Sequence, residues 1–319
     1  MWSTVTAYIA RRFAQSIVIL LGVTLLTFVL LHLIPAGPAR GILGQRATAG
    51  QIAAFEQAND LNKSVFQQYV LYLDHLLHGN FGYSYKLNQT VSSVFAQDLP
   101  KSLALVGPPT VLALAIGVLL GIWQSQRRDK LDDHLITGVG YVLYAMPDFW
   151  LAFILIDLFA LRLFWLPPIA PSSPSWTAAF TNAKAMILPW ATLTLVSIAV
   201  FSRYMRSSAL DALSQDHIRT AQAKGAQRGR ILRKHVIRNA SIPIITLIGL
   251  SIPGLLSGAI LEEVVFNYPG IGLATYNAAL VKDYPILLST TLVFGALTIA
   301  GNLVADIAYA YADPRVRLA

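Results

Sequence analysis

The chain has 319 residues, of which 55% are hydrophobic and only 13% are charged. This composition excludes an ordinary soluble domain and indicates a protein that crosses the membrane several times. The formal net charge is +8, but the basic residues fall between apolar segments and form no single basic face, so the charge does not predict nucleic-acid binding. Cysteine is absent, which excludes disulfides, thiolate zinc ligands and thiol catalysis.

Apolar windows of about twenty residues predict six transmembrane helices, and hence an all-α polytopic fold. The first window follows Arg11 and Arg12 and is longer than the apolar part of a signal peptide, so we expect it to be retained. The predicted spans cover residues 13–34, 102–123, 135–161, 186–204, 242–265 and 286–311. Prolines in or near these windows are expected to kink the helices without ending them; they are Pro108, Pro109, Pro147, Pro189 and Pro253.

Six spans would place both ends of the chain on the same side of the membrane. Most of the 24 Lys and Arg residues fall on that side, with the densest group in residues 205–241. This bias predicts that the side is cytoplasmic and that the protein lies in the cell (inner or plasma) membrane.

The segment 35–101 falls on the opposite side, together with the shorter segments 162–185 and 266–285. It is too long for a simple connection and carries apolar residues at helical spacing, so we expect an ordered extracytoplasmic cap. The spaced residues are Val65, Tyr69, Tyr72, Leu73 and Leu76. The chain is thus expected to divide into an N-terminal part with the first span (1–34), the cap segment (35–101) and a five-helix core (102–319).

The cytoplasmic loop 205–241 reads as two short helices on the membrane surface. Ser214 or Asp216 is expected to cap the first helix, and Gly225 to end it in the left-handed conformation. The second is expected over about 228–239.

The two predicted helices differ in what they can contact. The second has a basic face (Arg230, Arg233, Lys234 and Arg238) opposite a face that carries Ile231, Leu232, His235, Val236 and Asn239. Such a helix could lie on anionic lipid. The first helix lacks a large apolar face, and small residues at Ala221, Ala223 and Gly225 would instead let another protein approach closely.

Five acidic residues fall in or at the predicted spans, where a charge is costly and therefore suggests function. Asp157 lies near Arg162 and is expected to be a paired interfacial charge. Asp148 follows a proline and could either line a pathway or contact a helix break. The remaining acids are Glu262, Glu263 and Asp306; for Glu263 and Asp306 we expect pairing inside the bundle more than contact with a substrate.

At the cytoplasmic loop the chain resembles the membrane subunits of ATP-binding cassette importers, whose loop carries Glu-Ala-Ala, three residues and then Gly. The matching residues are Arg219, Thr220, Ala221 and Gly225, with Arg in place of Glu as in peptide permeases. The order of further motifs along the chain is similar to the B-type permease of dipeptide and oligopeptide importers. These motifs are Arg11-Arg12 with Leu21-Gly22-Val23, Gly79-Asn-Phe-Gly-Tyr-Ser84, Pro147-Asp-Phe-Trp-Leu151, Arg203-Tyr-Met-Arg-Ser-Ser208, Glu263-Val-Val-Phe266 with Tyr268-Pro-Gly-Ile-Gly272, Asp283-Tyr-Pro285, Asn302-Leu-Val-Ala-Asp306 and Asp313-Pro-Arg-Val-Arg317.

The resemblance implies a type I importer permease that forms half of a peptide pathway. It implies a second, C-type permease, two ATPase subunits and an extracytoplasmic binding protein as partners, in contact with membrane lipid and a peptide substrate. No Gly-x-x-x-x-Gly-Lys-Ser/Thr motif occurs in the sequence, so ATP and Mg²⁺ are expected on the ATPase subunits, with no enzymatic site, cofactor or metal in this chain. The residues expected to couple to the ATPases are Asp216, Arg219, Thr220, Ala221, Lys224 and Gly225.

Two alternatives remain open at this point. The same family includes permeases for nickel and glutathione, and haem is a further conceivable cargo. A self-sufficient proton-coupled carrier could use Asp148, Asp157 or Asp306 as a relay. Such a carrier has no need of the cytoplasmic helix pair, which favours the importer.

Overall fold

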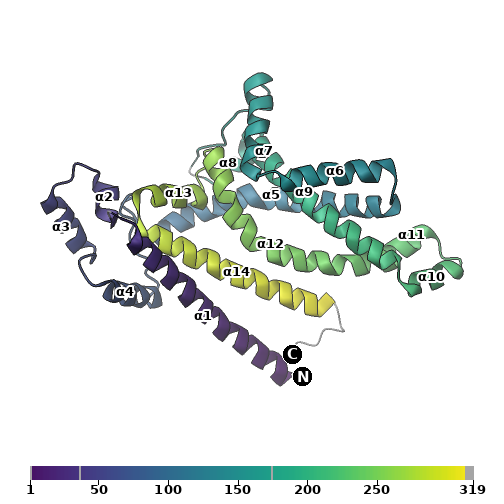
Figure 1. Ribbon diagram of the computed structural model, residues 1–319, viewed down its shortest axis with the longest axis horizontal. Helices are drawn as coiled ribbons and strands as arrows, with labels where there is room; N and C mark the ends of the chain where they lie inside the picture. Colours follow the sequence, from purple (N-terminus) through teal and green to yellow (C-terminus); the bar gives the residue numbers. More distant parts are fainter. Residues whose placement is uncertain (1, 36, 174, 313–319) are drawn as a thin grey trace.

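The computed structural model describes residues 2–35, 37–173 and 175–312 (Figure 1). Five long helices form an elongated bundle, and α1 runs beside α14 while α5 packs against α9. Each has between 29 and 36 residues, so at 1.5 Å per residue each is longer than the hydrocarbon core of a bilayer, about 30 Å thick. These helices are α1 (Trp2–Leu33), α5 (Val91–Gln126), α9 (Ala183–Leu213), α12 (Ile237–Val265) and α14 (Tyr284–Ala312).

By length and apolar composition, four of the described helices can cross a membrane, and a bent helix pair makes five. The remaining predicted span, 242–265, corresponds to α12, which is not among these five; the count of six stays a prediction. Three helix ends lie well outside the expected ones: α1 begins at Trp2, α5 begins at Val91 and α9 ends at Leu213. The part of α5 that precedes the predicted span contains an ion pair, in which Lys101 Nζ lies 2.6 Å from Asp98 Oδ1.

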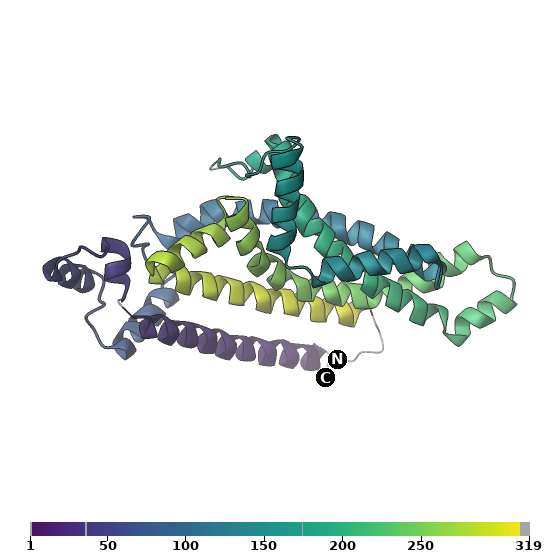
Figure 2. The ribbon, with the colours of Figure 1, turned by 45° about the horizontal axis from the view of Figure 1, so that its top comes forward.

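The predicted third span, 135–161, is wrong as a continuous helix. The structure has α6 (Leu131–Ala145), α7 (Asp148–Leu155) and a π-helical segment η1 (Ile156–Arg162), with a bend of 105° between the parts. Pro147 therefore ends a helix, because its ring disfavours the helical conformation of Met146, whose ψ is 131°. Figure 2 shows α7 standing away from the bundle.

The other prolines follow the expectation. Pro108 and Pro109 lie inside α5, Pro189 inside α9 and Pro253 inside α12. A helix can continue through a proline at the loss of one backbone hydrogen bond. Two short helices complete the core: α8 (Ala178–Thr181) and α13 (Ile271–Val281).

The cap segment folds into α2 (Gly37–Leu43), α3 (Ala49–Ala58) and α4 (Val65–Leu77). The helical spacing around Tyr69 and Tyr72 is confirmed by α4, which begins with a capping box at Ser64 and Gln67. Tyr69 donates a hydrogen bond from its hydroxyl to the Leu21 carbonyl of α1 (3.2 Å). In Figure 1 these helices lie at the end of the bundle opposite α10 (Asp216–Ala223).

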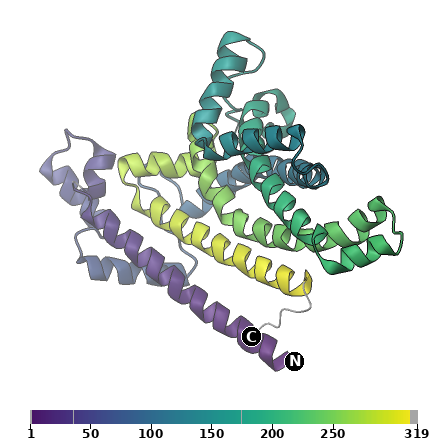
Figure 3. The ribbon, with the colours of Figure 1, turned by 45° about the vertical axis from the view of Figure 1, so that its right-hand side comes forward.

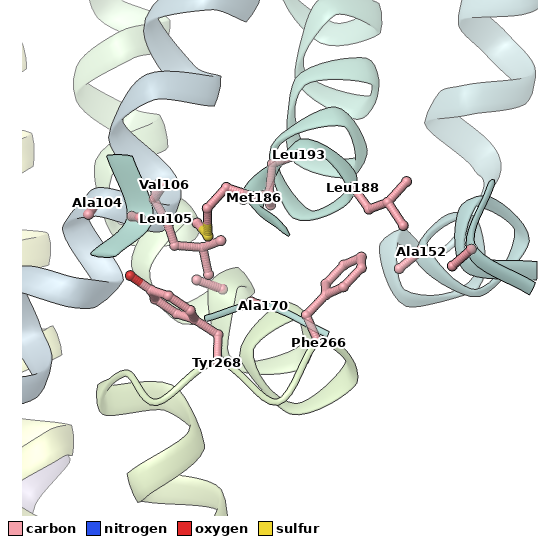
Figure 4. Close-up of a cluster of buried hydrophobic side chains, with 13 residues drawn as sticks. Ala104, Leu105, Val106, Ala152, Ala170, Met186, Leu188, Leu193, Phe266 and Tyr268 are labelled. Carbon is pink, nitrogen blue, oxygen red and sulfur yellow. The ribbon is translucent and has the colours of Figure 1, made fainter. Parts of the chain in front are cut away.

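A buried apolar cluster joins α5, α9 and the loop that follows α12 (Figure 4). Leu105, Met186 and Phe266 are fully buried in it. Burial of an aliphatic or aromatic side chain contributes about 1.5–3 kcal/mol, although helices within a lipid bilayer gain less from it than helices in water. This cluster holds the loop 266–270 against α5 and α9.

The helices α5 and α9 approach closely because α5 carries glycine where they cross. Gly117 and Gly121, four residues apart, both face α9. A Cβ on Gly121 would lie 2.6 Å from the Ser202 carbonyl oxygen and 2.8 Å from the Arg206 nitrogen. Small residues at this spacing let the backbones of membrane helices touch.

Candidate coupling site and membrane core

The loop after α9 folds into α10, a turn and α11 (Arg228–Ile231). The expectation that Ser214 or Asp216 caps α10 is wrong. The cap position belongs to Gln215 without a side-chain hydrogen bond, and the Ser214 hydroxyl instead donates to the Asp211 carbonyl of α9 (2.8 Å). Asp216 is the first helical residue, where its negative charge interacts favourably with the helix dipole.

The apolar side chains of Ile218 and Ala221 anchor α10 to the bundle. Ile218 is fully buried and packs in a cluster with Met205 and Ala209 of α9 and with Ile231 and Val236 of the next helix. The opposite face of α10 is open to solvent. Of the predicted coupling residues, Asp216, Arg219, Thr220, Lys224 and Gly225 are exposed and Ala221 is half-buried.

The predicted left-handed stop at Gly225 is confirmed. Its φ is +78°, and the chain reverses there through hydrogen bonds from the Gly225 N–H to the Gln222 carbonyl (2.9 Å) and from the Ala226 N–H to the Ala221 carbonyl (3.1 Å). A Cβ on Gly225 would meet nothing within 4 Å, so the backbone angle alone requires glycine.

The second predicted helix, 228–239, does not end where expected. The helix that begins at Arg228 continues through the π-helical segment η2 (Leu232–Val236) directly into α12. Val236 is buried as expected, but Asn239 is exposed and Ala240 is buried instead. The π turn adds a residue to the turn and so rotates the buried face. The basic side chains are exposed as expected: Arg230, Arg233, Lys234 and Arg238.

A buried ion pair fixes the start of α6 to the end of α9. Arg206 donates from Nε to Asp133 Oδ1 (2.7 Å) and from Nη2 to Oδ2 (2.6 Å), and the Asp129 N–H adds a third bond to Oδ2 (3.2 Å). Asp133 is 1% exposed. This pair was not predicted, because its partners lie 73 positions apart in the sequence. The available signal was an Arg and an Asp at the ends of neighbouring apolar windows.

Asp133→Ala is expected to destabilise the protein by about 3 kcal/mol, because it leaves the Arg206 guanidinium without its bidentate partner. Tryptophan fluorescence of the detergent-purified chain during heating would measure this loss. Asp132→Ala is the matched control: Asp132 pairs with the exposed Arg127 (2.8 Å) and accepts a hydrogen bond from the Asp133 N–H (3.1 Å), so its loss should shift the melting temperature less. Equal shifts in the two variants would contradict the structural role of the buried pair.

Glu263 is fully buried and holds the turn after α12 against α5. It accepts hydrogen bonds from the Ser102 hydroxyl (2.5 Å) and from the Leu273 N–H (2.8 Å), and Ser102 in turn accepts one from the Ile271 N–H (2.9 Å). Four residues of the chain thus form one network around this carboxylate. Its hydrogen bonds satisfy it inside the bundle.

Of the other acidic candidates, Asp148 and Glu262 lie near enough to interact electrostatically. Asp157 pairs with Arg162 at 2.8 Å, and both are exposed. Asp148 is half-buried at the start of α7. Glu262 is fully buried, and neither of its carboxyl oxygens has a hydrogen-bond partner among the described residues. Asp306 lies in α14, but its side chain is outside the described residues.

The cap segment is tied to the core through Asp283, between α13 and α14. Its buried carboxylate accepts hydrogen bonds from the Ser84 hydroxyl (2.5 Å), the Tyr85 N–H (3.2 Å) and the Lys86 N–H (3.1 Å). Burial, and then the nearby Asp283 charge, raise the pKa of Tyr85, so its hydroxyl stays protonated. Two of the motifs noted in the sequence, 79–84 and 283–285, therefore meet in space.

Comparison with known proteins identifies the family. Residues 113–318 match the profile of the binding-protein-dependent transport system inner membrane component, and residues 5–106 match that of its N-terminal part. The oligopeptide transport system permease protein AppB of Bacillus subtilis is 36% identical over 97% of this chain and 99% of its own.

Two further relatives are equally complete matches. The dipeptide transport system permease protein DppB of Alkalihalophilus pseudofirmus is 34% identical over 98% of this chain and 99% of its own. The glutathione transport system permease protein GsiC of Salmonella paratyphi A is 35% identical over 97% and 98%. Together with the long apolar helices, the two profile matches show that this multi-pass membrane protein belongs to the family of binding-protein-dependent transport system inner membrane components.

Proposed function

We propose that the chain is the permease subunit of an ATP-driven importer of dipeptides or oligopeptides and forms half of the translocation pathway. The observation that carries this proposal is the nearly full-length similarity to permeases named for oligopeptide and dipeptide transport. The bundle alone has few helices with which to surround a peptide. A second, similar permease subunit would complete the wall.

The exposed face of α10 is the surface that we assign to the ATPase subunits. It presents Asp216, Arg219, Thr220 and Lys224, while Ile218 holds the helix to the bundle. Because α11 continues into α12, a displacement of this surface would be carried to the membrane core. The chain lacks a phosphate-binding loop, so ATP and Mg²⁺ would be held by two ATPase subunits and catalysis would occur there.

The orientation follows from charge and shape. Figure 3 shows α10 and α11 projecting at one end of the bundle, and the cap segment lies at the other. The basic residues concentrate at the α10 end, which favours a cytoplasmic position for this end and for both termini. The cap segment would then face the extracytoplasmic binding protein.

Glutathione is a second candidate substrate, because one relative of similar identity is named as a glutathione permease. Glutathione is itself a short peptide, so the two readings differ in the length and side chains of the cargo. A proton-coupled carrier has less support, since Asp157, one of its candidate relay residues, is engaged by Arg162 at an exposed position.

Reconstitution tests the proposal. The four-subunit assembly in liposomes, with its binding protein, is expected to accumulate a labelled tripeptide only when ATP is supplied at the ATPase side. A non-hydrolysable ATP analogue serves as the control and should give no accumulation. Uptake by this chain alone, driven by a proton gradient and unaffected by removal of ATP, would overturn the importer and establish the carrier.

A further inference from the structure

A pocket of about 210 Å³ lies between α6 and α9, near the end of the bundle that carries α10. Its floor includes Gln124 of α5, and its walls include Tyr141 and Tyr144 of α6 and Arg203 and Ser202 of α9. The volume suffices for a small headgroup or the end of a peptide but not for a whole oligopeptide. The role proposed above for α10 makes no use of this pocket.

Gln124 lines this pocket and has a hydrogen-bond acceptor that no described residue uses. Its amide nitrogen donates to Asp133 Oδ1 (3.4 Å) and to Thr137 Oγ1 (3.2 Å). Because a carboxylate only accepts hydrogen bonds, this contact fixes which end of the amide is nitrogen. The Oε1 atom is then left buried without a partner, although the residue is only 2% exposed. A buried acceptor without a donor is costly, so a ligand with an N–H or O–H group would be stabilised here.

Arg203 contributes an unused cation. Its guanidinium carbon lies 4.3 Å from the centre of the Tyr144 ring and 5.6 Å from that of Tyr204, and among the described residues it makes neither an ion pair nor a hydrogen bond. Arg206 also lines the pocket, but Asp133 neutralises it. The pocket therefore keeps one net positive charge, carried on a planar group whose several N–H donors suit an oxyanion.

We propose that the pocket between α6 and α9 binds an oxyanion that has a hydrogen-bond donor beside it, with Arg203 receiving the anion and Gln124 Oε1 receiving the donor. The contact of the guanidinium with the Tyr144 ring is a cation–π contact, which occupies none of its N–H donors with a hydrogen-bond acceptor.

Two kinds of ligand carry an oxyanion with a hydrogen-bond donor beside it. The C-terminus of a peptide carries a carboxylate next to an amide N–H, and the headgroup of phosphatidylglycerol carries a phosphate next to hydroxyls. The peptide source rests on the proposed function, and the lipid source does not.

Gly140 offers a way to fill the pocket without touching its charges. It lines the pocket, and a Cβ built on it meets nothing within 4 Å, so the side chain of Gly140→Leu would occupy the ligand's space. Gly138→Leu is the matched control, because Gly138 lies on the same helix, is equally unobstructed and does not line the pocket. Arg203→Gln removes the cation, and Arg203→Lys retains the charge.

The first measurement compares tritiated trialanine with trialanine amide. Binding is measured to the four-subunit membrane assembly in phosphatidylcholine nanodiscs, without the binding protein. If the peptide carboxylate is the ligand, the free acid binds the wild type about tenfold or more tightly than the amide, because a charge-assisted hydrogen bond is lost. The difference should disappear in Arg203→Gln and Gly140→Leu, persist in Gly138→Leu and return in part in Arg203→Lys.

The second measurement uses nanodiscs that contain phosphatidylglycerol and native mass spectrometry of the released assembly. If the lipid is the ligand, the wild type and Gly138→Leu retain a phosphatidylglycerol molecule that Arg203→Gln and Gly140→Leu lose. The proposal is overturned if the acid-to-amide ratio and the lipid retention are both unchanged across all variants. ATP-driven uptake is measured in parallel. An assembly that imports peptide but binds no ligand in the pocket contradicts only the pocket proposal. An assembly that retains lipid but does not import contradicts only the proposed function.

Discussion

Gly121→Val should strongly destabilise the folded protein. The added side chain would meet the backbone of α9 at Ser202 and Arg206, where an ideal Cβ already lies 2.6 Å and 2.8 Å from main-chain atoms. Main-chain atoms of a long helix cannot move aside as the end of a flexible side chain can. We therefore expect the upper end of the overpacking range, a loss of about 3 kcal/mol in the free energy of unfolding.

Melting temperatures of the purified chain in detergent, followed by tryptophan fluorescence, measure this effect. Gly22→Val is the matched control, because Gly22 lies in the middle of α1 and a Cβ there meets nothing within 4 Å. Both variants introduce the same β-branched residue into a long apolar helix, so any difference comes from the approach of α9. A Gly121→Val protein that melts with the wild type would show that α5 and α9 do not cross closely at this position.

Gly225→Val should leave the protein folded in the membrane but reduce ATP-driven transport about tenfold or more. Left-handed backbone costs a residue with a Cβ about 1–2 kcal/mol, and the open space around Gly225 shows that no packing clash adds to this. The turn would relax by changing its angles, and the exposed face of α10 would then leave its position relative to the Ile218 anchor.

Gly225→Asn separates the backbone from the contact surface, because asparagine tolerates the left-handed conformation. Transport in reconstituted liposomes and copurification of the ATPase subunits are measured for both variants. Full retention of transport in Gly225→Asn, with loss in Gly225→Val, supports the backbone explanation. Equal losses would place the side chain against the ATPase, and wild-type behaviour of Gly225→Val would mean that α10 is not the coupling element.

Where a helix ends could be predicted from the sequence at one residue, Gly225, but not at another, Pro147. Gly225 ends α10 with a left-handed φ, and such a stop depends only on three or four neighbouring residues, so the sequence could predict it. Pro147 looked like Pro189 in its apolar window, yet it ends a helix while Pro189 lies inside one. Whether a proline ends a helix or only kinks it depends on how neighbouring helices pack around it. The sequence of a single apolar window does not show this packing.

The buried polar residues mark a second limit. Asp133 and Arg206 lie 73 positions apart, and Ser102 and Glu263 lie 161 apart, so each pairing depends on how the helices assemble. The apolar windows predicted that the acids must be satisfied, because an isolated charge in a membrane is costly. They did not indicate which neighbour satisfies each acid. The exposed residues of α10 were predictable because they depend on one helix alone.

The uninterrupted passage from α11 through η2 into α12 has a mechanical consequence. A helix of 29 residues, such as α12, is about 44 Å long, so a tilt of about 5° at one end carries the other end about 4 Å. That far end holds Glu263 and the turn fastened to Ser102 of α5. In the coupling proposed for α10, this continuous helix would act as a lever arm, because a small displacement at α10 would become a movement of about 4 Å at the end of the bundle that holds Glu263.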